Sequence, residues 1–401
     1  MWTPLHIWLA TTALSVLAMP YVWAQNTPRV KINASHAIQT DSNLFRLPAA
    51  ANTTALIGRS SAAEQIGITS LGINFNTTKS LQKFELDASL VNYNYQNFSH
   101  LNFSARNYNA AWRWALTPRL TGTFASDLKE TLNSFADYQG YNGNQRADTN
   151  TRFDVLYELV SPWFLLGGVS QSKQVNQQAV VAGGDYSSTS ADLGFRHVFS
   201  SGSAISYVAK AANGNYLNRV VPSVGFYDDS FKQIDNALRL QWILNGNSTA
   251  NIHLTHVNRT HPNYSQRDFS GFNTGFNIDW AITGKSVLGA SYTHELGSYA
   301  TATSNYSLTD RITWGPVWHI SPKTQLGLRH TWAQIDYLGS PNAIANSPRR
   351  DITRDTSLTL SWQPYQQLAI NASLQSKTRG SSQTGLDYDS SIATLSAQLS
   401  Y

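Results

Sequence analysis

Residues 84–90 read Phe-Glu-Leu-Asp-Ala-Ser-Leu, with an apolar residue at every second position and a polar or charged residue between. Successive side chains of a β-strand point to opposite faces, so this pattern predicts a strand with one apolar and one polar face. The same alternation recurs in residues 110–116, 153–159, 238–244, 276–280 and 358–362. The apolar repeats at three and four residues that indicate a helix are not sustained anywhere. The chain is therefore predicted to be all-β.

Turn signals separate these strands at a regular interval. Short turns are predicted at 78–80, 117–119, 161–162, 200–202, 245–247, 283–285, 321–323 and 363–365. Longer polar segments alternate with them, at 46–63, 96–99, 133–148, 174–187, 213–230, 259–268, 296–305, 338–352 and 379–388. Eight short turns and nine longer loops make seventeen connections, which predicts about eighteen strands. An even strand number and an alternation of short turns with long loops are typical of bacterial outer-membrane barrels.

The composition favours a membrane barrel over a soluble β-sandwich or β-helix. Only 13% of the residues are charged while 12% are aromatic, and a soluble surface needs more charge than this. Lipid offers no partner to an open sheet edge, so a sheet can cross a membrane only as a closed barrel with its apolar face outward. We expect an aromatic girdle near the strand ends, formed by Trp163, Trp280, Trp314, Trp332 and Trp362. The prediction is a transmembrane, antiparallel, up-and-down β-barrel in the bacterial outer membrane.

The two ends of the chain agree with this prediction. Residues 7–22 are mostly apolar, and residues 22–24 read Val-Trp-Ala, which predicts a signal peptide at 1–24 and a single barrel at 25–401. The alternatives for the first segment are a buried helix or a membrane anchor. Residues 393–401 alternate up to a terminal tyrosine. Such an ending resembles the signal read by the bacterial barrel-assembly machinery.

The motifs of enzymes, nucleotide-binding proteins and metalloproteins are missing from the sequence. There is no cysteine, no Gly-rich phosphate loop, no nucleophile elbow and no HExxH motif, so we predict no enzyme activity, cofactor or metal site. His253, His256, His294 and His319 lie in strands without matching ligands and are interpreted as ordinary barrel residues. No run of Lys and Arg indicates nucleic-acid binding.

The polar face of the strands supplies the candidate functional residues. If the apolar face is outward, a mixed set of eight basic and six acidic side chains lines the lumen. The lumen-facing candidates are Glu85, Asp87, Arg113, Arg152, Asp154, Glu158, Asp192, Arg196, Lys210, Arg239, Asp279, Arg311, Arg329 and Lys377. They either set the field of an aqueous channel or form ion pairs that only stabilise the wall. Tyr93, Tyr95 and Tyr108 are further candidates for contact with a passing sugar.

One segment near the predicted mature N-terminus carries a family resemblance. Residues 41–48 read Asp-Ser-Asn-Leu-Phe-Arg-Leu-Pro, and Asp41, Asn43, Leu44, Phe45 and Arg46 match the Asp-x-Asn-Leu-Phe-Arg-Leu segment of the EpsL-type outer-membrane proteins. The chain is similar to these proteins of exopolysaccharide loci, which are often associated with exosortase systems; a porin-2-like barrel is the related alternative. The second position, more often acidic in the family, is Ser42. Alternatively, Asp41 and Asn43 cap a strand, Leu44 and Phe45 pack at the rim, and Arg46 pairs with a loop carboxylate.

The resemblance implies a barrel that exports or assembles an extracellular polysaccharide, as a passive conduit or as part of an export complex. Expected partners are outer-membrane lipid or lipopolysaccharide, the polysaccharide, and periplasmic polysaccharide-export proteins. One alternative is a general diffusion porin for small solutes. Another is a structural barrel plugged by its own loops, for which loop 213–230 with Asp228, Asp229 and nearby Lys232 is a candidate.

Overall fold

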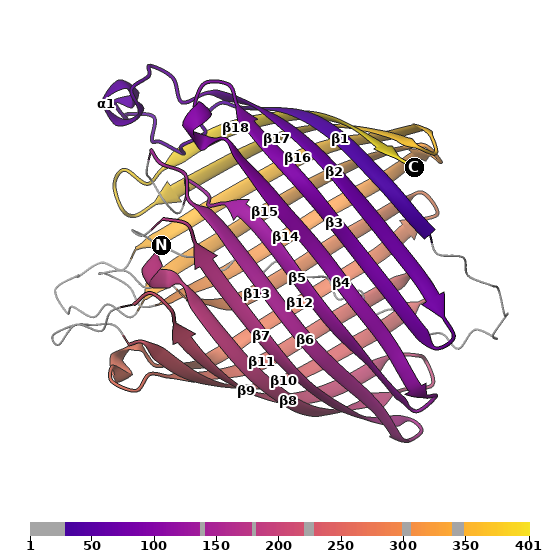
Figure 1. The fold of residues 1–401 in the computed structure, drawn as a ribbon. Coiled ribbons are helices and arrows are strands. Elements are labelled where there is room, and N and C mark those ends of the chain that lie inside the picture. The colour runs from indigo at the N-terminus through magenta and orange to yellow at the C-terminus, as the bar shows by residue number, and fades with distance from the viewer. Residues whose placement is uncertain (1–28, 137–140, 179–181, 220–227, 299–305, 339–348) are drawn as a thin grey trace.

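The computed structural model is a closed β-barrel of 18 antiparallel strands (Figure 1). It describes residues 29–136, 141–178, 182–219, 228–298, 306–338 and 349–401. The predicted signal peptide, residues 1–24, lies outside the described residues. Each strand pairs with its neighbours in the chain, and β1 pairs with β18 to close the ring. The fold class predicted from the alternation is confirmed.

The strands are 13 to 16 residues long, more than the roughly 9–11 residues that a tilted strand needs to cross the hydrocarbon core. Their bounds are β1 Arg29–Asp41, β2 Glu64–Lys79, β3 Gln82–Tyr95, β4 Phe103–Thr117, β5 Leu120–Leu132, β6 Gln145–Val160, β7 Trp163–Asn176, β8 Tyr186–Val198, β9 Ala204–Tyr216, β10 Ser230–Asn245, β11 Ser248–Thr260, β12 Phe269–Thr283, β13 Ser286–Ser298, β14 Tyr306–Ser321, β15 Thr324–Leu338, β16 Arg350–Tyr365, β17 Leu368–Ser381 and β18 Tyr388–Ser400. The short helices are α1 Thr53–Ile57, η1 Ser99–Leu101, η2 Ala182–Gly184 and η3 Ser265–Arg267. None of the helices in the described ranges is long and apolar enough to span a membrane.

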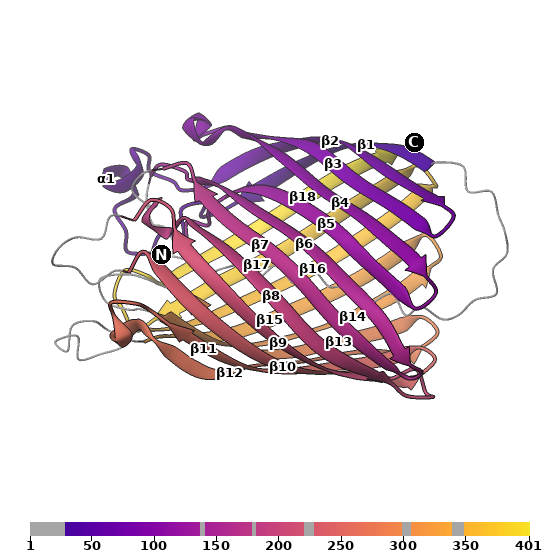
Figure 2. The same cartoon turned by 60° about the horizontal axis from the view of Figure 1, so that its bottom comes forward.

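The connections follow the predicted asymmetry. All eight short turns join strands at one end of the barrel, and the longer connections lie at the other end (Figures 1 and 2). The turn predicted at 363–365 lies wholly within a strand, because β16 continues to Tyr365 before the chain reverses, and the turn predicted at 78–80 begins two residues early, because β2 continues to Lys79. In outer-membrane barrels the short turns are periplasmic and the long loops extracellular. We use these names for the two ends.

The outer wall carries an apolar band with tryptophans at its periplasmic edge. Trp163, Trp280 and Trp362 lie within a few residues of the short turns and are about half exposed, as a girdle at the membrane interface requires. The placement of Trp314 and Trp332 near strand ends was wrong. Both lie in the middle of their strands, where a large ring is equally compatible with the acyl chains of the lipid.

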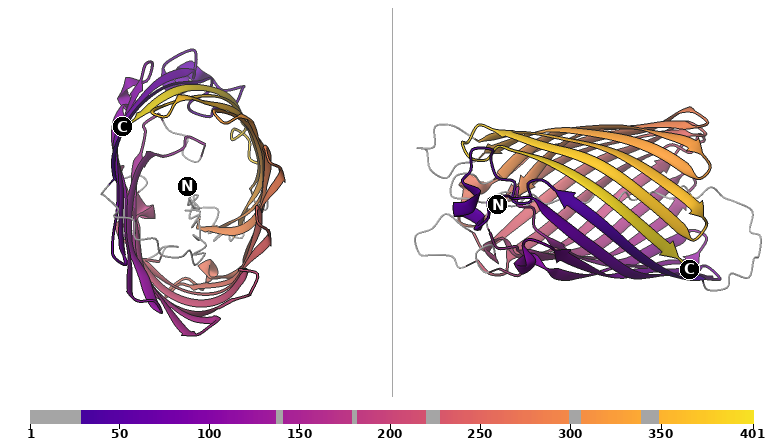
Figure 3. Two further views of the ribbon diagram at one scale, coloured as in Figure 1. Left: turned by 90° about the vertical axis from the view of Figure 1, so that its right-hand side faces the viewer. Right: turned by 90° about the horizontal axis from the view of Figure 1, so that it is seen from above.

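The C-terminal strand closes the barrel, and its last residue takes part. β18 pairs with β1 along nine registered positions, and the main chain of Tyr401 exchanges hydrogen bonds of 2.7 and 2.8 Å with Ile32. The end-on view shows the resulting closed, oval ring of strands (Figure 3).

Candidate functional site: the inner wall and the extracellular mouth

The cross-strand register assigns the two faces of the wall. Residues directly opposite each other in an antiparallel ladder share a face. One face, followed from strand to strand around the ring, carries the exposed Phe84, Leu238, Phe276 and Leu358 and is the lipid side. The other face is the lumen side. It holds all fourteen sequence-predicted lumen candidates: Glu85, Asp87, Arg113, Arg152, Asp154, Glu158, Asp192, Arg196, Lys210, Arg239, Asp279, Arg311, Arg329 and Lys377.

Some of these side chains form ion pairs with neighbouring side chains on the inner face. Glu85 accepts from Lys83 at 2.5 Å and from Arg113 at 2.7 Å, and Arg152 lies 3.4 Å from Asp154. The Arg113 side chain is nevertheless 48% exposed and the Asp154 side chain 44% exposed. Both side chains are therefore open to the space inside the barrel, as a lumen requires.

Four arginines of the inner face take no part in these ion pairs. In the part of the chain that the structure describes, Arg196, Arg239, Arg311 and Arg329 have no hydrogen-bond or ion-pair partner. Arg196 and Arg239 both lie opposite Ser206, two strands apart. Lys210, by contrast, lies directly opposite Asp192 and Asp235, so its charge is offset.

Three of the four arginines share one row of the ladder. The row runs from Arg196 through Arg239 and His253 to Gly275, and continues to Arg311 on β14. Arg196 is close to a short turn, whereas Arg311 is close to the extracellular end of its strand. Because the strands are tilted, one row of the ladder climbs the barrel. The inner wall therefore presents unpaired guanidinium groups at successive depths.

The sequence motif lies at the extracellular mouth and forms a closed cluster. Arg46 donates two hydrogen bonds to the Asp41 carboxylate, of 2.9 and 2.7 Å, and Ser390 of β18 donates a third at 2.7 Å. Asn43 bonds to the main chain of Leu47 in both directions, at 3.0 and 2.8 Å. Arg46 is in the left-handed region, with φ 56°. The chain therefore turns sharply as it leaves β1, and Arg46 pairs within the motif rather than with a loop carboxylate.

The apolar residues of the motif turn inward and pack on the inner wall. Phe45 is 2% exposed and contacts Phe98 and Phe135, each at 4.7 Å between ring centroids. The cluster continues onto Ile66 and Tyr95, which belong to the inner face. The connection after β1 thus folds into the mouth. Its stability comes from burial of aromatic side chains that an exposed loop would leave in water.

A second segment reaches across the same arc of the wall. Phe135, in the connection after β5, packs on Phe45, and the Ala136 carbonyl accepts a hydrogen bond from Arg379 on the inner face of β17. β17 and β5 lie on opposite sides of β18, β1, β2, β3 and β4. The described residues of these two connections therefore cover the inner wall at the mouth from β17 to β5.

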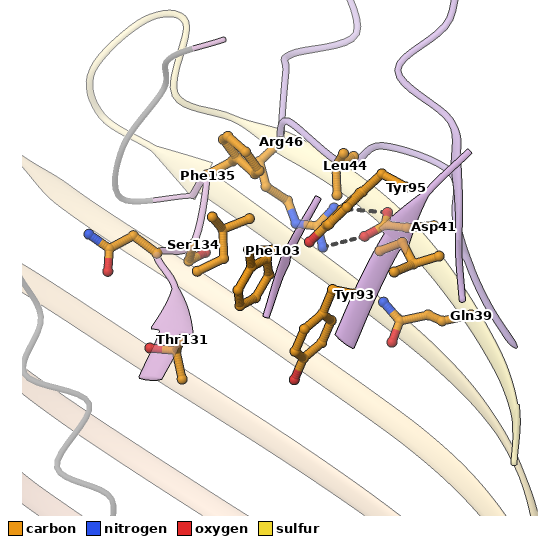
Figure 4. Close-up of a pocket in the computed structure, with 13 residues that line it drawn as sticks. Gln39, Asp41, Leu44, Arg46, Tyr93, Tyr95, Phe103, Thr131, Ser134 and Phe135 are labelled. Atoms are coloured by element: carbon orange, nitrogen blue, oxygen red, sulfur yellow. Dashed lines mark hydrogen bonds and ion pairs between the residues drawn. The ribbon is translucent and has the colours of Figure 1, made fainter. Parts of the chain in front are cut away.

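A pocket of about 270 Å³ opens between this cover and the wall (Figure 4). Its floor is an aromatic pair, Tyr93 and Phe103, stacked at 4.4 Å with only 4° between the ring planes. Tyr95 and the paired Asp41 and Arg46 form its upper side. Among the described residues, the Tyr93 hydroxyl has no hydrogen-bond partner. A stacked aromatic surface beside free hydroxyl groups suits a ring-bearing solute.

The expectations for the three tyrosines and for the loop at 213–230 are met only in part. Tyr93 and Tyr95 face the lumen, but Tyr108 does not: it lies opposite Ala88 and bonds to Ser126 on the outer face, because its strand alternates in the other phase. Asp228 is buried and accepts from Asn263 and Tyr264, so it anchors the neighbouring loop. Residues 220–227 of the proposed plug lie outside the described residues.

Two parts of the mouth were missed by the sequence analysis. Phe135 and Arg379 are separated by more than half of the chain, and neither stands in a motif. The aromatic character of Phe135 in a polar segment was the one available signal.

Solved structures give the fold a clear context. The barrel is similar to Pseudomonas aeruginosa OpdK with vanillate, at 12% identity and a TM-score of 0.52, covering 93% of this chain and 99% of that one. It is similar to OpdQ of the same organism, at 11% identity and a TM-score of 0.52, covering 93% and 98%. It is also similar to OccK2 (OpdF) in complex with glucuronate, at 11% identity and a TM-score of 0.50, again covering 93% and 98%.

The chain has a porin-like outer-membrane fold. Its location is the bacterial outer membrane, since its closed barrel presents an apolar band to lipid. No protein-family model matches the chain, and no curated protein matches its sequence. At these identities the likeness extends to the fold, and the choice of solute rests on the residues of the inner wall.

Proposed function

We propose that this protein is a passive, non-enzymatic channel for small organic anions. The observation that carries the proposal is a set of four inner-wall arginines that have no hydrogen-bond or ion-pair partner among the described residues: Arg196, Arg239, Arg311 and Arg329. An unpaired guanidinium attracts a carboxylate and can release it to the next one, because each contact is exchangeable. Three of the four share one row that climbs the barrel, which offers successive contacts along the path of the solute.

The structural neighbours support this class of solute. OpdK was solved with vanillate and OccK2 with glucuronate, and each of these compounds joins a ring to a carboxylate. In this chain the Tyr93–Phe103 surface would contact the ring at the mouth, and the arginines would attract the carboxylate deeper in the lumen.

The first test is ion selectivity in a planar bilayer. Under a KCl gradient we expect the reversal potential of the protein to show preference for chloride. Changing Arg196, Arg239, Arg311 and Arg329 together to Gln should lower the anion-to-cation permeability ratio several-fold, because the lumen loses four positive charges. The matched control changes the outer-wall Lys173 and Lys232 to Gln and should leave the ratio unchanged. Cation preference in the unmodified protein, or an unchanged ratio in the quadruple variant, would sink the proposal.

The second test concerns the aromatic surface. Tyr93→Leu should weaken the reversible block of the channel by vanillate roughly two- to twelvefold, the equivalent of the ~0.5–1.5 kcal/mol of an aromatic pair. Tyr108→Leu is the control, since Tyr108 lies on the outer wall. Equal loss in both variants would mean that the effect comes from a weakened barrel rather than from a lost contact.

Polysaccharide export is the second candidate, and the resemblance of residues 41–48 to the EpsL-type segment is the observation that favours it. In the structure these residues bond to one another and to Ser390 and pack on the inner wall, an arrangement that is stable without a polymer. Deletion of the gene in the producing organism separates the candidates. Loss of secreted polymer with normal uptake of small anions would favour export; normal secretion with impaired uptake would favour the small-solute channel.

A further inference from the structure

The charged side chains of the outer wall gather at one level. On the lipid-facing side of the described strands, Asp, Glu, Lys and Arg residues occur in the extracellular halves, except Lys79 beside a short turn. These extracellular-half residues are Arg106, Glu130, Lys173, Lys232, Asp310, Asp336, Arg350, Arg354 and Asp389. A charge is costly at the midplane of the membrane and costs little at the interface, so this level lies near the outer edge of the apolar band.

Strand β16 gives the depth of that edge. Trp362 of the periplasmic girdle and Arg354 lie on the same outer face, eight residues apart. At a rise of about 3.3 Å per residue and a tilt of about 40°, they are roughly 20 Å apart along the barrel axis. The apolar band of such barrels is about 25 Å tall. Arg354 therefore lies within about 5 Å of the outer edge of the band, and its long side chain can reach the headgroups of the outer leaflet.

At this level the wall has a hollow of about 390 Å³ between the extracellular ends of β16 and β17. Arg350, Arg354, Gly380, Ser382 and Asp387 are among its lining residues. Gly380 creates the space, because a Cβ built there would meet no heavy atom within 4 Å. The hollow opens on the lipid side, with two guanidinium groups at its wall.

Arg350 and Arg354 differ in their hydrogen-bond partners. Arg350 donates to Asp336 at 2.6 Å, whereas Arg354 is exposed and has no partner in the described part of the chain. Asp387 accepts from the main chain of Ser381 at 2.7 Å. The two acidic groups near the hollow therefore already have partners: Asp336 pairs with Arg350, and Asp387 accepts the main-chain hydrogen bond. Neither forms an ion pair with the Arg354 guanidinium.

We infer that this hollow binds the phosphorylated headgroup of an outer-leaflet glycolipid. A planar guanidinium binds a phosphate through two parallel hydrogen bonds, which Arg354 has free. Directly below the hollow, Leu358 and Leu374 face each other across β16 and β17, 43% and 62% exposed, and offer an apolar surface to the acyl chains. A free phosphate ion would use the arginines but would leave that surface uncovered, so the arrangement favours a lipid.

The experiment measures lipid binding to the full-length protein in detergent micelles by native mass spectrometry. The probes are diphosphorylated lipid A, dephosphorylated lipid A and inorganic phosphate. We expect diphosphorylated lipid A to bind more tightly than the dephosphorylated form. Arg354→Gln should weaken its binding about tenfold, the scale of one charge-assisted hydrogen bond. Gly380→Val should weaken it similarly while keeping both arginines, because a Cβ at this position meets no heavy atom within 4 Å and the new side chain extends into the hollow.

Lys173→Gln is the matched control, since it removes a positive charge at the same level of the outer wall but away from the hollow. Unchanged binding in both Arg354→Gln and Gly380→Val would overturn the inference, as would an equal loss in Lys173→Gln. Displacement of the lipid by equimolar inorganic phosphate would overturn the assignment to a lipid. The inference is independent of the proposed solute, because Arg354→Gln should leave the ion selectivity of the channel unchanged.

Discussion

Replacing Arg46 by alanine is expected to release the inward-folded segment at the mouth and to raise the conductance of the channel. Asp41 is 2% exposed and Arg46 is the partner of both its carboxylate oxygens. Removing one member of a buried ion pair leaves the other charge buried without a partner, which costs about 3–5 kcal/mol of stability. The pair lies where β1 passes into the segment that carries Phe45, so this cost falls on the docking of that segment rather than on the strand ladder.

Single-channel recording and limited proteolysis measure the two consequences. In Arg46→Ala we expect larger conductance steps and faster cleavage within residues 42–63. The double variant Asp41→Asn, Arg46→Leu should restore much of the docking, because it removes the stranded charge and keeps an oxygen for the Asn43 N–H and the Ser390 hydroxyl. If Arg46→Ala matches the unmodified protein in both measurements, the segment does not narrow the channel.

The strand count and the two faces of the wall were predictable because their signals are local. Side-chain direction repeats every two residues, so a stretch such as 84–90 shows which residues share a face without knowledge of the partner strand. The tyrosine that was placed on the wrong side shows the limit of this reasoning. Tyr108 was grouped with Tyr93 and Tyr95 as a candidate for sugar contact, but its own strand alternates with Trp112 outward, which puts Tyr108 outward as well.

The architecture of the mouth was not predictable from the sequence. Residues 41–48 were recognised as a motif, but two different outcomes were compatible with them, a contact with polymer and a packed rim. The choice depends on Phe135 and Arg379, which the closure of the barrel brings to the same arc. The arginine row was also not predictable from the sequence. Arg196 and Arg311 become members of one row only through the pairing of seven successive strands.

A charge placed on the outer wall at mid-depth should destabilise the barrel far more than the same charge placed one residue away. Leu358 lies midway between Trp362 and Arg354 on the outer face of β16 and is 43% exposed to the lipid side. Leu358→Arg is expected to cost about 2–4 kcal/mol of unfolding free energy, because the guanidinium has no water at that depth. Thr359→Arg should cost much less, because Thr359 faces the lumen beside Gly327, where there is room and water.

Unfolding in urea with the protein in lipid vesicles compares the two variants directly. The difference between the unfolding free energies of the two variants does not include the effect of arginine on strand propensity, because both positions lie in the same strand and are paired on both sides. A larger loss in Thr359→Arg would reverse the assignment of the two faces and remove the arginine row from the lumen. A larger loss in Leu358→Arg would support the assignment of the lumen face, on which the cross-strand register places Arg196, Arg239, Arg311 and Arg329, as the selectivity measurement requires.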